Sequence, residues 1–397
     1  MPITIHPVEK LYFDGTHRSR SPEETRAAVE PLMTEIGVTE IIDVTPLDRL
    51  GIPVYSAVRP GAARGAVRVH AGKGKEPVHA RVSAMMEALE RYCAEYRGDR
   101  MEYATYEEIG PGRAVHPEDL IIPRKLEQGE KLHWTPVWDI LNDEEAYVPS
   151  NAVFHPYDSL GMAIPLFRSD SNGLASGNVM EEAILHALFE VIERDALSVA
   201  EQKRDLGCRL TVEKECAARE VLDRFEENGI DIHLWLLNGK TGIPTVAAAA
   251  DDTVMKDPAM LVIGSGTHTC PEIAVLRALT EVAQSRGSYL QGGRNDPQRE
   301  MILRKAGYER LKRINRMWFA DADAVDVADV PDASTTRFDL DIRRTIEEVA
   351  VHTDRVCVCD LSRTPIPVVR VIVPGFEVSY MDPDRKRPGQ GANLPGF

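Results

Sequence analysis

Several features are missing from this chain of 397 residues, and each absence argues against a class of protein. Its six cysteines form no CxxC pair and no His–Cys cluster at zinc spacing, so neither a disulfide framework nor a structural zinc site is expected. No apolar run approaches the length that crosses a bilayer, which argues against a membrane span. The N-terminal MPITIHPVEK lacks the basic and apolar regions of a signal peptide, and we predict a cytoplasmic protein.

Negative charge exceeds positive charge in this sequence. The formal net charge is −16 at pH 7 and no long basic run occurs. Because phosphate backbones are held by Lys and Arg, a nucleic-acid partner is not expected. The remaining composition, with 43% hydrophobic and 28% charged residues, is that of a globular protein. No sequence period of about 20 to 50 residues recurs, which argues against a solenoid.

Helix and strand signals alternate along the chain. Residues 21–37 begin with Ser21 and Pro22, continue with acidic residues and end on a glycine, which is typical of a helix. The apolar segments 231–237 and 243–250 flank the turn NGKTG and predict an antiparallel strand pair. We therefore expect an α+β fold, with mixed sheets and packed helices. Other strands are expected within 38–60, 65–73, 259–266, 356–361 and 368–375, and other helices within 76–97, 181–196, 212–228, 271–289, 290–318 and 340–352.

One helix carries an unusual acidic face. In EEAILHALFEVIERDA, residues 181–196, an arc of about 80° holds Glu182, His186, Glu190 and Glu193, with apolar residues opposite. Taken alone, this is an ordinary amphipathic helix with a solvated face. His186 is equally compatible with packing and with a contact to a site.

The same spacing recurs about a hundred residues earlier. SAMMEALER, residues 83–91, and HALFEVIER, residues 186–194, both contain E-x-x-E-R, and RALTEVAQSR, residues 277–286, offers a variant. Two carboxylates about 4 Å apart repel by about 4 kcal/mol at an effective dielectric constant of 20, so converging pairs need protons or cations. Oxygen ligands favour Mg²⁺, which in proteins usually accompanies substrate phosphates. The phosphates would be contacted by the cations Lys73, Arg91, Arg194 and Arg277.

Other site types fit the sequence less well. AGKGK is too short for a Walker A motif, so a nucleotide site would be unconventional. A di-iron carboxylate site requires two E-x-x-H pairs on a helix bundle, whereas this chain has E-x-x-E and many strands. Cys357 and Cys359 in RVCVCDL stand at strand spacing, and we predict core packing rather than a sulfur relay.

Four ordered motifs resemble the YcaO family. SAMMEALERY, SNGLASGNVMEEAILHALFEVIERDA, AVLRALTEVAQSR and PVVRVIVPGFE are similar to its successive signatures, from about residue 20 to about residue 380. The resemblance implies a nucleotide site between carboxylate-bearing helices, in one continuous catalytic unit over 71–397 after a lead-in over 1–70. It also implies ATP and Mg²⁺ as cofactors and phosphorylation of a peptide backbone amide oxygen, after which a nucleophile attacks the amide carbon.

The resemblance also assigns roles to residues. The expected Mg²⁺ ligands are Glu87, Glu90, Glu182, Glu190 and Glu193. The expected nucleotide contacts are Lys73, Ser83, Arg91, Asn178, Arg194, Arg277, Glu281, Gln284 and Arg286, of which Arg194 and Glu281 are also expected to be catalytic.

Members of the family differ in their nucleophile. A neighbouring Cys, Ser or Thr gives an azoline, and external sulfide gives a thioamide. The ending KRPGQGANLPGF departs from the PxPxP tail of azoline formers, and no fused peptide-recognition domain is seen. The sequence therefore resembles methanogen members that thioamidate a glycine of the methyl-coenzyme M reductase α subunit. A TfuA-like sulfur-delivering partner and a homodimer are expected. The alternatives are an azoline-forming cyclodehydratase and a non-catalytic nucleotide-binding accessory protein.

Overall fold

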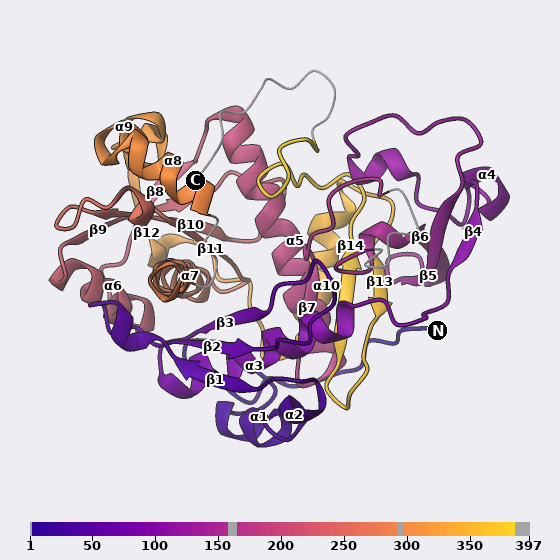
Figure 1. Ribbon diagram of the computed structural model, residues 1–397, viewed down its shortest axis with the longest axis horizontal. Helices are drawn as coiled ribbons and strands as arrows, with labels where there is room; N and C mark the ends of the chain where they lie inside the picture. The colour runs from indigo at the N-terminus through magenta and orange to yellow at the C-terminus, as the bar shows by residue number, and fades with distance from the viewer. Residues whose placement is uncertain (1, 158–164, 293–296, 386–397) are drawn as a thin grey trace.

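The computed structural model describes residues 2–157, 165–292 and 297–385 (Figure 1). Over these residues helices pack with three sheets whose strand pairs are mostly antiparallel, which confirms the expected α+β fold. The first sheet has the order β1-β2-β3 and is antiparallel throughout. Its strands are β1 (Glu40–Asp43), β2 (Val54–Val58) and β3 (Val69–Lys73). The expected lead-in over 1–70 is thus paired strand to strand with the residues that follow it.

The second sheet has the order β11-β10-β9-β8-β12. Strands β9 and β10 are antiparallel around the NGKTG turn, which confirms the expected pair, while β12 runs parallel to β8. The bounds of these strands are β8 (Cys208–Thr211), β9 (Ile230–Leu236), β10 (Thr245–Asp252), β11 (Ile263–Thr267) and β12 (Ala324–Asp326).

The third sheet has the order β4-β5-β13-β14-β7, with β6 paired to β5. The hairpin of β5 and β6 was not expected, because Pro136 stands inside β5 and two exposed glutamates begin β6. Cys357 and Cys359 are buried in β13, which confirms the predicted core packing. The bounds are β4 (Glu102–Ala104), β5 (Leu132–Asp139), β6 (Glu144–Pro149), β7 (Leu174–Ser176), β13 (Cys357–Asp360) and β14 (Val368–Ile372).

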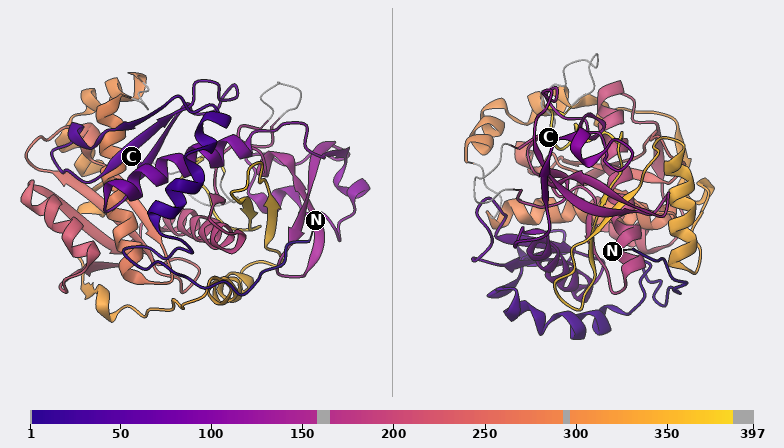
Figure 2. Two further views of the ribbon diagram at one scale, coloured as in Figure 1. Left: turned by 90° about the horizontal axis from the view of Figure 1, so that it is seen from below. Right: turned by 90° about the vertical axis from the view of Figure 1, so that its right-hand side faces the viewer.

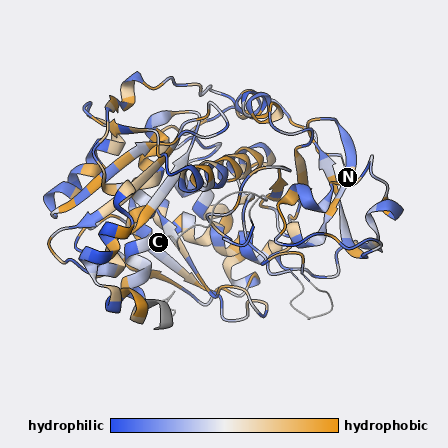
Figure 3. Cartoon of the chain, turned by 90° about the horizontal axis from the view of Figure 1, so that it is seen from above, coloured by the Kyte–Doolittle hydropathy of each residue, from blue (hydrophilic) through white to orange (hydrophobic). Residues whose placement is uncertain are grey.

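Three long helices lie between the sheets and position the site (Figures 1 and 2). Helix α3 (Pro77–Ala94) packs on β2 and β3, α5 (Met180–Lys203) on β7 and β14, and α7 (Pro271–Gln291) on β10 and β11. Hydrophobic residues gather on the strands and on the helix faces that cover them (Figure 3). The other helices are α1 (Pro22–Val29), α2 (Leu32–Glu35), α4 (Tyr106–Ile109), α6 (Ala217–Glu227), α8 (Pro297–Ala306), α9 (Tyr308–Ile314) and α10 (Phe338–Ala350).

Glycines allow these helices to lie directly on their strands. A Cβ at Gly72 of β3 would stand 2.1 Å from the backbone nitrogen of Ala84 in α3. A Cβ at Gly264 of β11 would stand 2.2 Å from the carbonyl oxygen of Ala278 in α7. The two helices therefore sit at a fixed, close distance from the strands that hold them.

One sequence-based expectation needs adjustment. The single helix expected over 21–37 is divided into α1 and α2 at Pro31, because proline cannot donate the helical hydrogen bond. The ending KRPGQGANLPGF, residues 386–397, lies outside the described residues, so its departure from the PxPxP pattern stays a prediction from the sequence. Among the described helices, none combines the length and apolar character needed to cross a membrane.

Candidate nucleotide site

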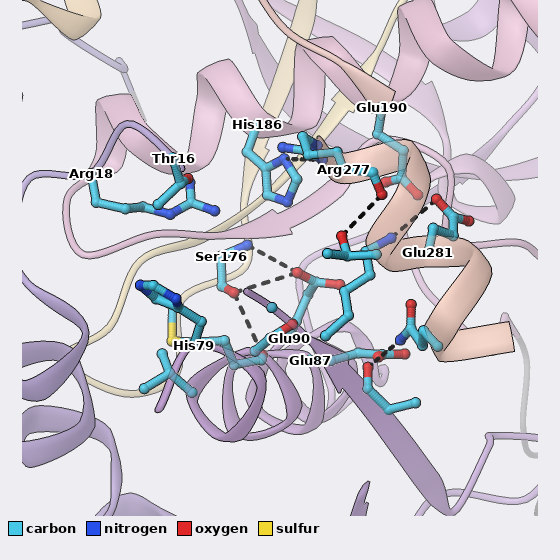
Figure 4. Close-up of a pocket in the computed structure, with 18 of the residues that line it drawn as sticks. Thr16, Arg18, His79, Glu87, Glu90, Ser176, His186, Glu190, Arg277 and Glu281 are labelled. Carbon is cyan, nitrogen blue, oxygen red and sulfur yellow. Dashed lines mark hydrogen bonds and ion pairs between the residues drawn. The ribbon is translucent and has the colours of Figure 1, made fainter. Parts of the chain in front are cut away.

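A pocket of about 480 Å³ opens between α3, α5, α7, β3 and the N-terminal segment 12–25 (Figure 4). With one exception, every site residue expected from the sequence lies in its wall. The expected residues that line the pocket are Lys73, Ser83, Glu87, Glu90, Arg91, Asn178, Glu182, His186, Glu190, Glu193, Arg194, Arg277, Glu281 and Gln284.

The two E-x-x-E pairs face this one pocket from separate helices. Glu90 of α3 accepts a hydrogen bond from the backbone nitrogen of Ser176 at 3.0 Å. On α5, Glu190 accepts one from the backbone nitrogen of Gly173 at 3.2 Å, and Glu193 accepts one from Ser265 Oγ at 2.9 Å. The spacing of three residues places both carboxylates of each pair on one side of their helix. Residues about a hundred positions apart thus meet in a single site.

Two carboxyl groups of the pocket, Glu90 and Glu190, have raised pKa values. Burial raises the pKa of Glu90 to about 8, and the negative charges of Glu190 and Glu87 add to this rise although Arg91 opposes it. Burial likewise raises the pKa of Glu190, with Glu193 adding to the rise. Each group would regain its charge if a cation approached, because opposite charge favours the ionised form. The two carboxyl groups are therefore suited to bind a divalent cation.

Basic side chains line the same pocket. Arg91 and Arg194 each lie 3.7 Å from the glutamate four positions earlier in their own helices, Glu87 and Glu190 respectively. The Nη1 of Arg91 and the Nε of Arg194 are buried and have no hydrogen-bond partner among the described residues. Unused guanidinium donors next to carboxylates fit an anion whose oxygens also bind a metal, as the phosphates of a nucleotide do.

Helix α7 contributes the third group of side chains. Glu281 pairs with Lys73 of β3, with 3.1 Å between Nζ and Oε2. Arg277 Nη2 lies 3.2 Å from His186 Nδ1, so His186 is a pocket residue in contact with an arginine. Burial, followed by the positive charge of Arg277, holds the pKa of His186 well below its usual range. A neutral imidazole can accept the hydrogen bond of the guanidinium.

Glu182 is held by protein groups. Its carboxylate accepts hydrogen bonds from Ser19 N at 3.0 Å and Ser19 Oγ at 2.8 Å, and Arg18 lies 3.7 Å away.

Within the described part of the chain, no three His, Cys, Asp or Glu side chains form a group that could hold a metal. Mg²⁺ usually keeps waters and takes oxygens from substrate phosphates. The arrangement therefore fits a metal that arrives with a nucleotide.

Arg286 is the exception to the expected set. It lies outside the pocket wall and pairs with Asp48 at 2.7 Å and Asp252 at 3.1 Å. Nine residues separate it from Arg277, which at about 100° per residue turns its side chain to the opposite face of α7. The expected nucleotide contact is thus replaced by a buried ion pair that anchors the helix.

The N-terminal segment was not expected to contribute to the site. Tyr12, Arg18 and Thr25 line the pocket, and the hydroxyl of Tyr12 lies 2.8 Å from His79 Nε2 (Figure 4 labels Arg18 and His79). The backbone and hydroxyl groups of Ser176 and Ser265, which bind the glutamates, were missed too. These residues lie outside the helix patterns that marked the rest of the site, so the sequence carried no periodic signal for them.

Known proteins are similar to this chain in sequence and in fold. Residues 71–377 match the family described as YcaO cyclodehydratase, ATP- and Mg²⁺-binding. An uncharacterised protein of Methanothermobacter thermautotrophicus is 47% identical over 92% of this chain and 96% of its own length. An uncharacterised protein from the tfuA 3′ region of Rhizobium leguminosarum bv. trifolii is 32% identical over 92% of this chain and 90% of its own length.

A solved structure extends the comparison to three dimensions. The YcaO protein of Methanopyrus kandleri, bound with AMPPCP and Mg²⁺, is 32% identical to this chain, with a TM-score of 0.80. The match covers 98% of this chain and 99% of that one. ATP and Mg²⁺, the cofactors expected from the sequence, are those of the matched family. The sequence match and the shared fold together establish that this chain belongs to the YcaO family.

Proposed function

We propose that this protein uses ATP and Mg²⁺ to phosphorylate the oxygen of a peptide backbone amide, and that sulfide then attacks the amide carbon to give a thioamide. The observation that carries the proposal is the convergence of Glu87, Glu90, Glu190 and Glu193 in one pocket, together with arginine donors that have no partner among the described residues. Bound with Mg²⁺, ATP supplies the phosphoryl group. An amide oxygen is a poor leaving group, and loss as phosphate makes its departure easy.

The residues of the pocket fall into two groups with different proposed roles. Glu87, Glu90, Glu190 and Glu193 would hold Mg²⁺, and Glu182 would join them only by giving up its bonds to Ser19. The remaining residues would bind and orient the nucleotide and stabilise charge that develops during transfer. These residues are Lys73, Ser83, Arg91, Asn178, Arg194, Arg277, Glu281 and Gln284.

Two comparisons support sulfide as the nucleophile. The relative with 47% identity comes from a methanogen, and the relative from Rhizobium leguminosarum bv. trifolii is encoded beside tfuA. By this argument the substrate is a glycine of the methyl-coenzyme M reductase α subunit and a TfuA-like protein delivers the sulfur. We extend the proposal to a homodimer that works in the cytoplasm.

Azoline formation is the second candidate, because the matched family is described as a cyclodehydratase. The two reactions differ in the origin of the attacking atom. An azoline former uses the side chain of a neighbouring Cys, Ser or Thr, whereas a thioamide former needs sulfide from outside.

Mass spectrometry of one peptide separates these reactions. The peptide carries the target glycine and no Cys, Ser or Thr, and it is incubated with ATP and Mg²⁺, with and without sulfide. Exchange of oxygen for sulfur adds about 16 mass units and should occur only with sulfide. Modification seen only after a Cys, Ser or Thr is restored, with loss of water, would assign the protein to azoline formation. An unchanged mass in every sample would favour an accessory role.

A further inference from the structure

One cation in the wall of the nucleotide pocket differs from the others in its contacts. Four basic residues of the wall are assigned to the nucleotide, and three of them pair with a glutamate, Lys73 at 3.1 Å and Arg91 and Arg194 at 3.7 Å. The fourth, Arg277, forms no ion pair with a carboxylate of the described residues. Its guanidinium group contacts an imidazole instead, with 3.2 Å between Arg277 Nη2 and His186 Nδ1 (Figure 4).

This contact interrupts a row of carboxylates. His186 stands on the acidic face of α5, four residues after Glu182 and four residues before Glu190. Residues at this spacing are neighbours on the surface of a helix, so an acidic residue at position 186 would have continued the row. A histidine occupies the place where Arg277 of α7 reaches α5.

The surroundings keep the imidazole of His186 uncharged. Burial, followed by the positive charges of Arg277, Arg18 and Lys73, holds the pKa of His186 well below its usual range. A neutral imidazole accepts a hydrogen bond through one ring nitrogen and donates through the other. Nδ1 therefore accepts the hydrogen bond of Arg277, and the proton of the ring is carried by Nε2.

Other charged groups act on Arg277 from a greater distance. Burial lowers the pKa of Arg277, whereas the negative charges of Glu193, Glu281 and Glu190 raise it and Arg18 opposes them. These three glutamates have closer cationic partners of their own.

Glu281 pairs with Lys73, and Glu190 and Glu193 each lie 3.7 Å from Arg194. A carboxylate in direct contact with Arg277 would occupy guanidinium donors and offset its charge. An imidazole orients the same group and leaves the charge in place.

We propose that His186 is a positioning residue, which holds Arg277 in the pocket wall through a neutral acceptor and so keeps its positive charge available to the phosphates of the nucleotide. This inference rests on the assignment of Arg277 to the nucleotide in the proposed function. It also explains why the acidic face of α5 contains a histidine between two glutamates.

Three substitutions of nearly equal size separate the parts of this proposal. His186→Asn keeps a neutral acceptor close to the position of Nδ1, His186→Leu has a similar shape without an acceptor, and His186→Asp has an acceptor with negative charge. Calorimetry measures the binding of Mg²⁺ and AMPPCP, an analogue of ATP, to the full chain. The Asn variant should bind within about twofold of the wild type, and the Leu and Asp variants should each bind about tenfold more weakly.

A second histidine provides a matched control. His233 of β9 lies outside the pocket wall, and its Nδ1 stands 3.0 Å from Arg209 Nη1, which is the same type of contact. His233→Leu removes this contact and should leave the affinity for the nucleotide unchanged. Melting temperatures verify that every variant folds.

The set of variants gives a decisive result in each case. Equal affinities of the Asn and Leu variants would overturn the proposal, because the acceptor would then have no effect. Wild-type affinity of His186→Asp would overturn it too, since the charge of Arg277 would not need to remain free.

A further variant separates this inference from the proposed function. Arg277→Leu should also weaken binding, and an unchanged affinity would exclude Arg277 from the nucleotide site and refute the role of His186 with it. Thioamide formation is measured independently by mass spectrometry. A protein that forms no thioamide but shows the expected binding pattern would refute the proposed reaction and support the positioning role of His186.

Discussion

Glu90 provides a prediction that links the electrostatics of the pocket to nucleotide binding. Burial raises the pKa of this carboxyl to about 8, so at neutral pH the free protein holds it mostly protonated. A carboxyl group must lose its proton before it can bind Mg²⁺. Binding of Mg²⁺–ATP should therefore release a proton from Glu90 and should strengthen as the pH rises.

The size of the effect follows from the pKa. With a value of about 8, the ionised fraction of Glu90 rises about 25-fold between about pH 6.5 and pH 8.5, and affinity should rise by a similar factor. At about pH 7, Glu90 alone should release about 0.9 proton for each nucleotide bound. Burial raises the pKa of Glu190 as well, and its titration acts in the same direction.

Stability without ligand should show the opposite trend. The folded pKa of Glu90 lies above its ordinary value of 4.5, so between these values the folded state binds more protons than the unfolded state. The free energy of unfolding should then fall as the pH rises from about 4.5 to about 8. Glu90→Gln removes this contribution, and its unfolding energy should depend less on pH.

Calorimetry in two buffers of different ionisation enthalpy measures proton release, and repeated titrations give the affinity at each pH. Glu90→Gln should bind more weakly and with a flatter pH profile, while Glu226→Gln, on the exposed part of α6, should match the wild type. An affinity that is constant with pH, or a proton count unchanged in Glu90→Gln, would refute the argument that Glu90 is held protonated in the free protein.

The helix patterns predicted which glutamates come together in the pocket, while the roles of these residues stay predictions. Carboxylates three residues apart share a helix face, so the recurrence of E-x-x-E-R in residues 83–91 and 186–194 pointed to one pocket before any fold was known. The same geometry could have excluded Arg286, which lies about 180° from Arg277 around α7. Proximity within a motif does not determine the direction in which a side chain leaves its helix.

Other parts of the molecule could not be predicted in this way. Ser19 and Glu182 are 163 residues apart, and Ser19 lies in a loop that has no periodic pattern. Strand β5 contains Pro136, which opposes a strand assignment, yet its hydrogen bonds to β4, β6 and β13 outweigh that preference. Such contacts depend on tertiary packing, and a local reading of the sequence does not contain them.

Three further predictions concern the glutamates, the helix anchor and the close packing of α7. Glu190→Gln should abolish ATP hydrolysis with little change in melting temperature, because a polar group in the pocket wall contributes little packing. Unchanged hydrolysis would show that Glu190 has no role in the reaction. Arg286→Met should lower the free energy of unfolding by about 3–5 kcal/mol in urea denaturation, because it leaves buried Asp252 with one cation fewer and Asp48 without its partner. A stable variant that is impaired only in ATP binding would instead assign Arg286 to nucleotide binding. Gly264→Ala tests whether the distance between β11 and α7 matters for the site: the new Cβ would stand 2.2 Å from a backbone oxygen of α7, which cannot be relieved by turning a side chain. The helix must therefore move away from the strand and carry Arg277 and Glu281 with it. We expect a loss of about 3 kcal/mol in stability together with a higher KM for ATP, whereas a destabilised variant with an unchanged KM would show that the position of α7 does not control nucleotide binding.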